Sequence, residues 1–381
     1  MIGTTALPEG GRVDFARLRA ERRTRLAAAM AAHHLDALIL GRPANIVYAS
    51  GARQLWTAGA RPFGPGAVVV RETGHVHLLS TWDDGVPAEI PHDDLFGLSW
   101  NPANLLAKLA ALPGLKAARR VGTDSSSPGF GQFLAAIAPE AELVDAGPAI
   151  ATARAVKTPD ELACIETATA LAEAALDALT EAVRPGVGER ELVGVYLACL
   201  AGRGEPAPPT EGVVCATPRH GPVSLRQVPT DRLVGPDELV VLNPGARYAG
   251  YEGGVGRTWV AGPSEPTAAQ RALAQRCRDA LDAVLDQCRA GRTGADLRRA
   301  WEATGEPLPA APLAHGLGLG METPVVAAGC GDGAELVPGM VLAVQGWVQA
   351  EGVGGFLERH VAVIAEDGPR VLSRFGRGPV A

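Results

Sequence analysis

The sequence predicts a two-domain protein of the α/β (α+β) class, and three observations support this fold class. The chain has 381 residues, enough for two hydrophobic cores. Helical and strand-like patterns alternate over its N-terminal part, which is typical of an α/β domain. Further on, apolar runs at Leu239–Leu242 and Val255–Val260 flank a Pro-Gly turn and predict two antiparallel strands. We expect an N-terminal domain over residues 1–152 and a C-terminal domain over residues 153–381.

The N-terminal domain is expected to alternate helices with short strands. Leu18, Leu26 and Met30 share one face of an amphipathic helix from about Phe15 to His34. The elements that follow are strand-like DALIL at 36–40, AVVVR and HVHLL, a helix near Leu105–Leu112, a strand around Val121, a helix near Phe130–Ile137 and a strand around Leu143. This domain shows no cluster of catalytic residue types, so we expect it to support a site or a dimer.

The C-terminal domain is predicted to begin with a long helix that ends near Val183. Thr158 stands at its N-cap, Pro159 at its first helical position and Glu161 at the spacing of a capping box. Further helices are expected at Glu189–Leu200, Ala268–Cys288 and Gly294–Thr304, with a loop over GRGEPAPPTEG.

Charge and composition exclude several classes of protein. The formal charge of -7, from 35 basic and 42 acidic residues, argues against binding to nucleic acid. Neither a signal peptide nor a membrane span is indicated, so we expect a cytoplasmic protein that does not bind membranes. The six cysteines lack the spacing of a metal knuckle, and we expect free thiols that are mostly buried.

Four motifs of the C-terminal domain occur in one order. They are LVVLNPGARYAGYEGGVGRTWV at 239–260, HGLG at 315–318, PGMVLAVQ at 338–345 and GGFLE at 354–358. In this order they resemble the motifs of the pita-bread hydrolases, the family of methionine aminopeptidase, aminopeptidase P, prolidase and creatinase. The segment LDALILGRPANIVYASG is similar to the opening of the N-terminal domain of creatinase and aminopeptidase P. The resemblance implies a curved, mostly antiparallel C-terminal sheet and a homodimer.

The resemblance also implies where two metal ions would bind in the peptidases of this family. Asn243 and Gly254 stand where those enzymes carry Asp, and His315 stands at the position of a ligand His. Gln345 and Glu358 stand at the positions of two ligand Glu. Two divalent ions need carboxylates to offset their charge, and this set offers one. We therefore expect no metal and no other cofactor.

Creatinase is the metal-free member of the family and also carries Asn at the first ligand position. The likeness to creatinase is incomplete, because its guanidinium-binding Glu is replaced by Gly256 and its catalytic His is absent before Thr230. The nearest His, His220, lies further upstream. Creatine is therefore not expected as the substrate.

The remaining polar residues of these motifs are assigned candidate roles. His315 is the expected proton-transfer group, with Glu358 to orient it and Glu322 in the place of the family's second His. The candidate substrate-binding residues are Asn243, Gln345, Glu252, Arg257, His220 and His360. Each His and each charged residue also has an ordinary structural interpretation, as a core, surface or salt-bridged side chain.

Three functions remain open at this point. The first is a metal-independent hydrolase, or a related C–N bond-cleaving or proton-transfer enzyme, that acts on a small polar nitrogen compound. The second is a non-catalytic protein that binds a peptide or metabolite in the same cleft. The third is an Xaa-Pro metallopeptidase with an altered metal site.

Overall fold

The computed structural model of the protein describes residues 12–52, 66–80, 83–97, 101–124, 134–203, 213–331 and 333–376. The chain divides into two compact units, one that ends at Arg154 and one that begins at Ala155. The boundary expected near Thr152 falls in the same helix, Gly147–Ala155. Most of the loop expected over GRGEPAPPTEG lies outside the described residues. No helix of the described ranges is long and apolar enough to cross a membrane.

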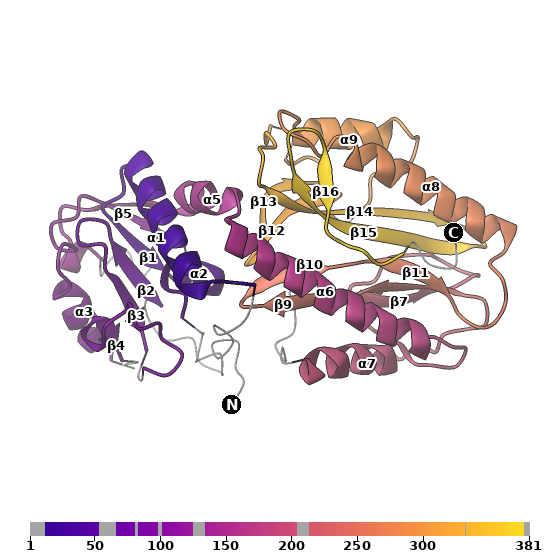
Figure 1. Cartoon of the computed structure of the whole chain (residues 1–381), viewed down its shortest axis with the longest axis horizontal. Coiled ribbons are helices and arrows are strands. Elements are labelled where there is room, and N and C mark those ends of the chain that lie inside the picture. Colours follow the sequence, from indigo (N-terminus) through magenta and orange to yellow (C-terminus); the bar gives the residue numbers. More distant parts are fainter. Residues whose placement is uncertain are drawn as a thin grey trace. The chain divides into compact units, whose positions relative to one another are not determined.

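The N-terminal unit is built on a mixed sheet in the order β4-β3-β2-β1-β5-β6 (Figure 1). Strands β1, β2 and β3 pair antiparallel, whereas β3-β4, β1-β5 and β5-β6 pair parallel. Its elements are α1 (Phe15–Ala32), β1 (Ala37–Leu40), α2 (Pro43–Ser50), β2 (Ala67–Val70), β3 (Val76–Leu79), η2 (His92–Asp94), β4 (Leu95–Phe96), α3 (Pro102–Ala110), β5 (Arg120–Thr123), β6 (Glu142–Asp145) and α5 (Gly147–Ala155). The alternating pattern predicted from the sequence is confirmed, although part of the helix expected near Phe130–Ile137 lies outside the described residues.

The C-terminal unit contains three sheets, in the orders β10-β9, β11-β8-β7 and β13-β12-β14-β15-β16. A bridge between Gly256 and Arg359 connects β11 to β15, so the second sheet continues into the third. The helices are α6 (Pro159–Ala182), α7 (Glu189–Gly202), α8 (Ala268–Leu285) and α9 (Gly294–Glu302). The strands are β7 (Val213–Thr217), β8 (Leu239–Asn243), β9 (Gly245–Tyr248), β10 (Tyr251–Gly254), β11 (Arg257–Val260), β12 (Ala314–Gly318), β13 (Gly320–Val326), β14 (Val341–Ala350), β15 (Gly354–Ile364) and β16 (Pro369–Val371).

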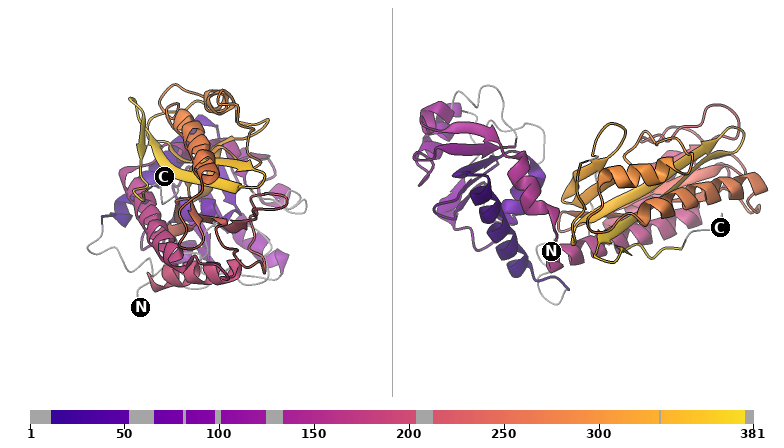
Figure 2. Two further views of the ribbon diagram at one scale, coloured as in Figure 1. Left: turned by 90° about the vertical axis from the view of Figure 1, so that its right-hand side faces the viewer. Right: turned by 90° about the horizontal axis from the view of Figure 1, so that it is seen from above.

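Helices cover one face of these strands, and this arrangement defines an outer and an inner face. Helix α8 runs along β14 and β15 (Figure 2). Val344, Val348, Phe356 and Ala362 pack with α8 and α9 in one hydrophobic core. Helices α6 and α7 form a second core with the outer side of β8. The residues that alternate with these core residues along the same strands therefore point to the inner face.

The central segment folds differently from the single hairpin predicted from the sequence. Strands β8 and β11 pair antiparallel as expected, with Leu242 opposite Arg257. The chain does not reverse at the Pro-Gly pair, however, but continues through β9 and turns at Ala249 and Gly250. Both residues have positive φ, of 51° and 86°, as a tight two-residue hairpin turn requires.

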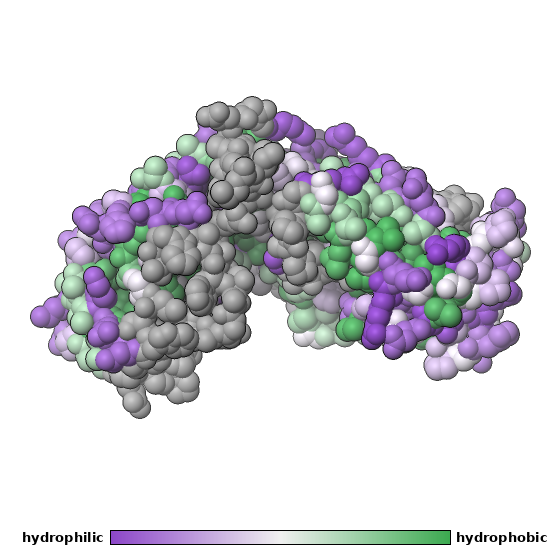
Figure 3. Space-filling view, turned by 90° about the horizontal axis from the view of Figure 1, so that it is seen from below, coloured by the Kyte–Doolittle hydropathy of each residue, from purple (hydrophilic) through white to green (hydrophobic). Residues whose placement is uncertain are grey.

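The surface of the C-terminal unit carries an apolar area bounded by polar residues (Figure 3). Among the described residues, the large exposed hydrophobic side chains of this unit are Leu197, Val228, Leu233, Met321 and Val371. The homodimer that the sequence resemblance implies stays a prediction.

Helix α6 begins with the capping box predicted from the sequence. The Thr158 hydroxyl accepts a hydrogen bond from the Glu161 amide, and the Glu161 carboxylate accepts one from the Thr158 amide. The same carboxylate also accepts a hydrogen bond from the Tyr251 hydroxyl, which connects the start of α6 to β10.

Replacing Thr158 by Ala removes this cap from a buried position. We expect Thr158→Ala to lower the free energy of unfolding by about 1 kcal/mol, measured by urea unfolding. Thr158→Ser keeps the hydroxyl and is the control, expected to match the wild type more closely. Equal midpoints for Thr158→Ala and the wild type would contradict the role given to the cap.

Candidate functional site

Strand register decides which candidate residues face the interior of the curved sheet. In β14 and β15, Gln345 lies directly opposite Arg359, and Gly346 lies opposite Glu358. His315 of β12 lies opposite Ala343 of β14. Because outward residues such as Val344 pack against α8, His315, Gln345 and Arg359 all lie on the inner face.

Asn243 joins this group at the end of β8. Its side chain is buried, with 4% of its surface exposed, and its Oδ1 has no hydrogen-bond partner. A Cβ atom added at Gly256 would lie 3.0 Å from Asn243 Oδ1, 2.9 Å from Arg359 Cβ and 2.6 Å from Leu357 Cδ2. Asn243 and Arg359 thus converge over Gly256, and a larger residue there would require these side chains and Leu357 to shift.

The guanidinium of Arg359 lies beside Gly254. A Cβ atom added at Gly254 would be 3.3 Å from both Cζ and Nη1 of Arg359. At the position where the peptidases carry their second Asp, this chain therefore combines a missing side chain with a neighbouring positive charge. We call Asn243, His315, Gln345 and Arg359 the inner-face cluster.

The structure corrects the position expected for Glu358. Its carboxylate lies on the outer face, where Oε2 is 3.2 Å from Arg278 Nε of α8 and Oε1 is 2.9 Å from His360 Nε2. Nδ1 of His360 is in turn 2.7 Å from Ser373 Oγ. Burial favours the neutral acid, but the hydrogen bond from His360 and the nearby arginine charges lower the pKa of Glu358 below its usual value. Glu358 and His360 therefore belong to a buried ion-pair network and do not meet His315.

His315 is held in one orientation by its own strand. Its Nδ1 is 2.9 Å from the carbonyl oxygen of Gly316, so the neutral ring donates from Nδ1 and carries its lone pair on Nε2. The side chain is buried, with 2% exposed. Gln345 donates from Nε2 to the Pro312 carbonyl at 2.9 Å, which fixes its amide.

Three other candidates have structural partners of their own. Glu322 accepts from Lys157 Nζ at 2.7 Å, and both side chains are buried. Glu252 accepts from Nε and Nη2 of Arg247 at 3.1 and 2.9 Å. The Arg257 guanidinium, expected to bind a substrate carboxylate, donates instead to backbone carbonyl oxygens, those of residues 256, 359, 375 and 376.

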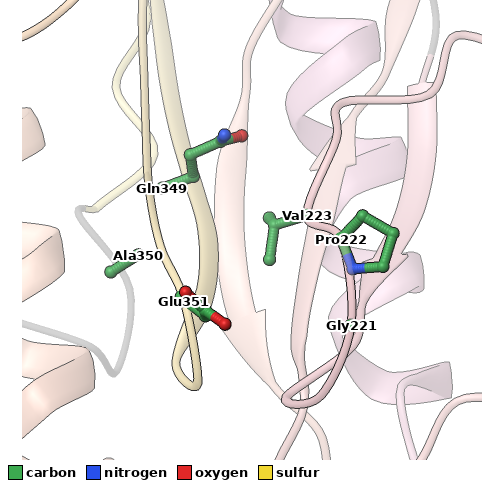
Figure 4. Close-up of a pocket in the computed structure, with 6 residues that line it drawn as sticks. All are labelled: Gly221, Pro222, Val223, Gln349, Ala350 and Glu351. Carbon is green, nitrogen blue, oxygen red and sulfur yellow. The ribbon is translucent and has the colours of Figure 1, made fainter.

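His220 is exposed and directly precedes Gly221, which lines a separate pocket. This cavity of about 510 Å³ is lined by Gly221, Pro222, Val223, Gln349, Ala350 and Glu351. Figure 4 shows it between the segment after β7 and the end of the β14–β15 hairpin. Its lining includes no member of the inner-face cluster. On the same strands, Leu225 and Trp347 pack on a hydrophobic cluster that includes Cys215, Val241 and Leu357.

The inner-face cluster does not fit the two divalent ions that the family resemblance implies. It offers two amides, one imidazole and a guanidinium, and it contains no carboxylate. Amide oxygens are weak ligands, and a guanidinium repels cations. Within the described part of the C-terminal unit, no three His, Cys, Asp or Glu side chains converge as metal ligands would.

Sequence reasoning missed Arg359 because nothing in the strand distinguishes it from Glu358. Every residue of β15 is buried, so the alternation of polar and apolar residues that normally identifies the inward face is absent. The cysteines agree with expectation in being free, with Cys164, Cys215, Cys277 and Cys288 buried, although Cys330 is exposed.

The Glu358 network leads to a pH-dependent prediction for stability. At neutral pH, Glu358→Gln should lower the free energy of unfolding by about 3 kcal/mol, because buried Arg278 loses its counter-charge. The pKa of Glu358 is lowered by folding, so this contribution is complete above the unfolded value of about 4.3 and declines as the pH falls through the folded value. Urea unfolding between pH 7 and pH 3 measures it.

The matched control is Glu166→Gln, which removes a partly exposed pair with Arg370. Such a pair contributes about 1 kcal/mol or less. Equal losses in the two variants, or a Glu358→Gln loss that does not change with pH, would contradict the assignment.

Comparisons with known proteins agree with this fold. The model of metallopeptidase family M24 matches residues 163–366, and that of the creatinase/prolidase N-terminal domain matches residues 22–156. A Xaa-Pro dipeptidase of Pyrococcus horikoshii is 27% identical over 360 residues, which cover 90% of this chain and 94% of that protein. An uncharacterised peptidase of Bacillus subtilis is 25% identical over 270 residues, 67% of this chain and 73% of that protein.

Solved structures show the same fold over nearly the whole chain. The prolidase of Pyrococcus horikoshii OT3 superposes with a TM-score of 0.76 at 22% identity and covers 94% of this chain and 99% of its own. The Xaa-Pro dipeptidase of Bacillus anthracis gives a TM-score of 0.77 at 18% identity, covering 94% and 98%. The chain therefore belongs to metallopeptidase family M24, the pita-bread hydrolases, and its N-terminal unit is a creatinase/prolidase N-terminal domain.

Proposed function

We propose that this protein is a metal-independent member of the family whose inner-face cluster binds a small peptide-like compound through its carboxylate group. The observation that carries this proposal is the Arg359 guanidinium, which lies beside Gly254 and opposite Gln345. A guanidinium is suited to bind a carboxylate through two parallel hydrogen bonds. Where the peptidases of the family carry carboxylates that bind metal ions, this site carries the Arg359 guanidinium, which is suited to bind a carboxylate.

The neighbours of Arg359 support the same class of ligand. Asn243 Oδ1 is a buried acceptor without a partner, and a ligand N–H group would satisfy it. A compound with both an amide or amine N–H and a carboxylate matches Asn243 and Arg359 together. The relatives named Xaa-Pro dipeptidase suggest which compounds to test first, since a dipeptide carries both groups.

Binding without turnover is the function that the geometry supports best. The two carboxylates expected to assist His315 are engaged elsewhere, Glu358 with Arg278 and Glu322 with Lys157. A general base also needs an orienting partner and a route for its proton. The hydrogen bond from His315 Nδ1 to the Gly316 carbonyl oxygen orients the ring, but neither Glu358 nor Glu322 is positioned to take part in proton transfer.

One observation favours a second candidate, metal-independent cleavage of a C–N bond or proton transfer by His315. The hydrogen bond from Nδ1 to the Gly316 carbonyl leaves the basic lone pair on Nε2, as a general base requires. Turnover of a bound compound in the presence of chelators, lost in His315→Ala, would favour this candidate. Turnover that requires added Mn, Co or Zn would instead favour an Xaa-Pro metallopeptidase and contradict the proposal.

Gly254 offers a specific test of carboxylate binding. In Gly254→Asp the new carboxylate would reach the Arg359 guanidinium and compete with a ligand, whereas Gly254→Ala adds only the Cβ atom. The probes are glycyl-proline and alanyl-proline, each compared with its C-terminal amide by calorimetry in EDTA. We expect each acid to bind at least about tenfold more tightly than its amide, as a charge-assisted hydrogen bond implies.

Gly254→Asp should abolish this preference, and Gly254→Ala should keep it. Circular dichroism and thermal unfolding of both variants establish that each remains folded. Equal affinities for acid and amide in the wild type, or unchanged binding in Gly254→Asp, would contradict the role of Arg359.

A further inference from the structure

A second cluster of polar side chains lies in the N-terminal unit, where no cluster was expected from the sequence. His75 Nδ1 is 3.0 Å from Asp94 Oδ2, and His77 Nδ1 is 3.1 Å from Asp94 Oδ1. The two imidazole rings have centroids 5.9 Å apart. Within the described residues, these three side chains are the one group of His, Cys, Asp or Glu whose ligand atoms all lie within 4.8 Å of one another.

Strand geometry brings these residues together. His75 directly precedes β3 and His77 lies two positions on, so in extended chain both side chains project from the same face. Asp94 ends η2 and immediately precedes β4, which pairs parallel to β3 with Leu78 opposite Leu95. The pairing of β3 with β4 therefore carries the Asp94 carboxylate to the two imidazoles.

His77 is the observation that points to a ligand. The residue is 3% exposed, and neither ring nitrogen makes a well-directed hydrogen bond, although Nδ1 lies 3.1 Å from Asp94 Oδ1. A buried imidazole that makes no good hydrogen bond is costly, and an ion that accepts the Nδ1 lone pair would satisfy that nitrogen.

We propose that His75, His77 and Asp94 bind one transition-metal ion of the zinc class. Two imidazoles and one carboxylate are a donor set that suits Zn²⁺ better than Mg²⁺ or Ca²⁺. Ligand atoms about 2.0 Å from a tetrahedral ion are about 3.3 Å apart, close to the 3.0 and 3.1 Å that separate the two imidazole Nδ1 atoms from the Asp94 carboxylate oxygens. The fourth position faces solvent, because the His75 side chain is 52% exposed, and a water molecule completes the coordination.

This ion would connect β3 to the segment that leads into β4. Its role is distinct from the chemistry of the inner-face cluster, and the inference does not depend on the proposed function. The metal content of the whole protein does not distinguish this site from the C-terminal unit, so variants of each site are needed to locate the ion.

The test uses the full chain, stripped with EDTA and titrated with Zn²⁺ and Co²⁺. We expect one Zn²⁺ per chain in competition with a chromophoric chelator, and the visible absorption bands of four-coordinate Co²⁺. His75→Ala should lose both signals. His75 is the informative position because it is exposed, so this variant is expected to fold even if His77→Ala does not.

His92→Ala is the matched control. Like Asp94, His92 lies in η2, and like His75 it is exposed. It pairs with Asp83 at 2.9 Å rather than with Asp94. His92→Ala and His315→Ala should both retain one ion per chain. Zn²⁺ should raise the thermal midpoint of the wild type and of these controls but not that of His75→Ala. Absence of Zn²⁺ binding in the wild type, or binding that survives in His75→Ala, would overturn the proposal.

Discussion

The pairing of β14 with β15 is the constraint on which the candidate site depends. Gln345 lies opposite Arg359, and Gly346 lies opposite Glu358, without a bulge along the two strands. A shift of one residue would exchange every inward and outward side chain. It would bury the Glu358 carboxylate beside His315 and turn the Arg359 side chain toward α8. The register therefore decides whether the interior of this fold carries negative or positive charge.

The outer face accommodates the remaining carboxylate by pairing it. Arg278 of α8 lies over the Phe356 ring and contacts Glu358, while His360 contacts the other carboxylate oxygen. A charge at this depth is tolerated only with such partners. The inner face has the opposite composition, with a guanidinium among amides and one imidazole. One strand thus presents a paired carboxylate on its outer face and a guanidinium on its inner face.

The sequence predicts much of this fold and part of the site. Thr158 and Glu161 are predictable because a capping box is local, and His315 and Gln345 because their motifs fix their strands. Arg359 is not predictable, because β15 is buried on both faces and only its pairing with β14 decides which of its residues face inward. The turn at Ala249 and Gly250 was missed because Pro244 gave a stronger turn signal. Asp94 lies far along the chain from His77, and only the pairing of β3 with β4 brings them together.

The central claim is that the interior of the C-terminal unit binds a carboxylate in place of metal ions. Elemental analysis of the His75→Ala protein tests it most directly, because this variant removes the proposed N-terminal site. The protein is soaked in Mn²⁺, Zn²⁺ and Co²⁺, desalted and measured. We expect no bound ion, because the inner-face cluster contains no carboxylate. About two ions per chain would contradict it and would identify the protein as a metal-dependent peptidase.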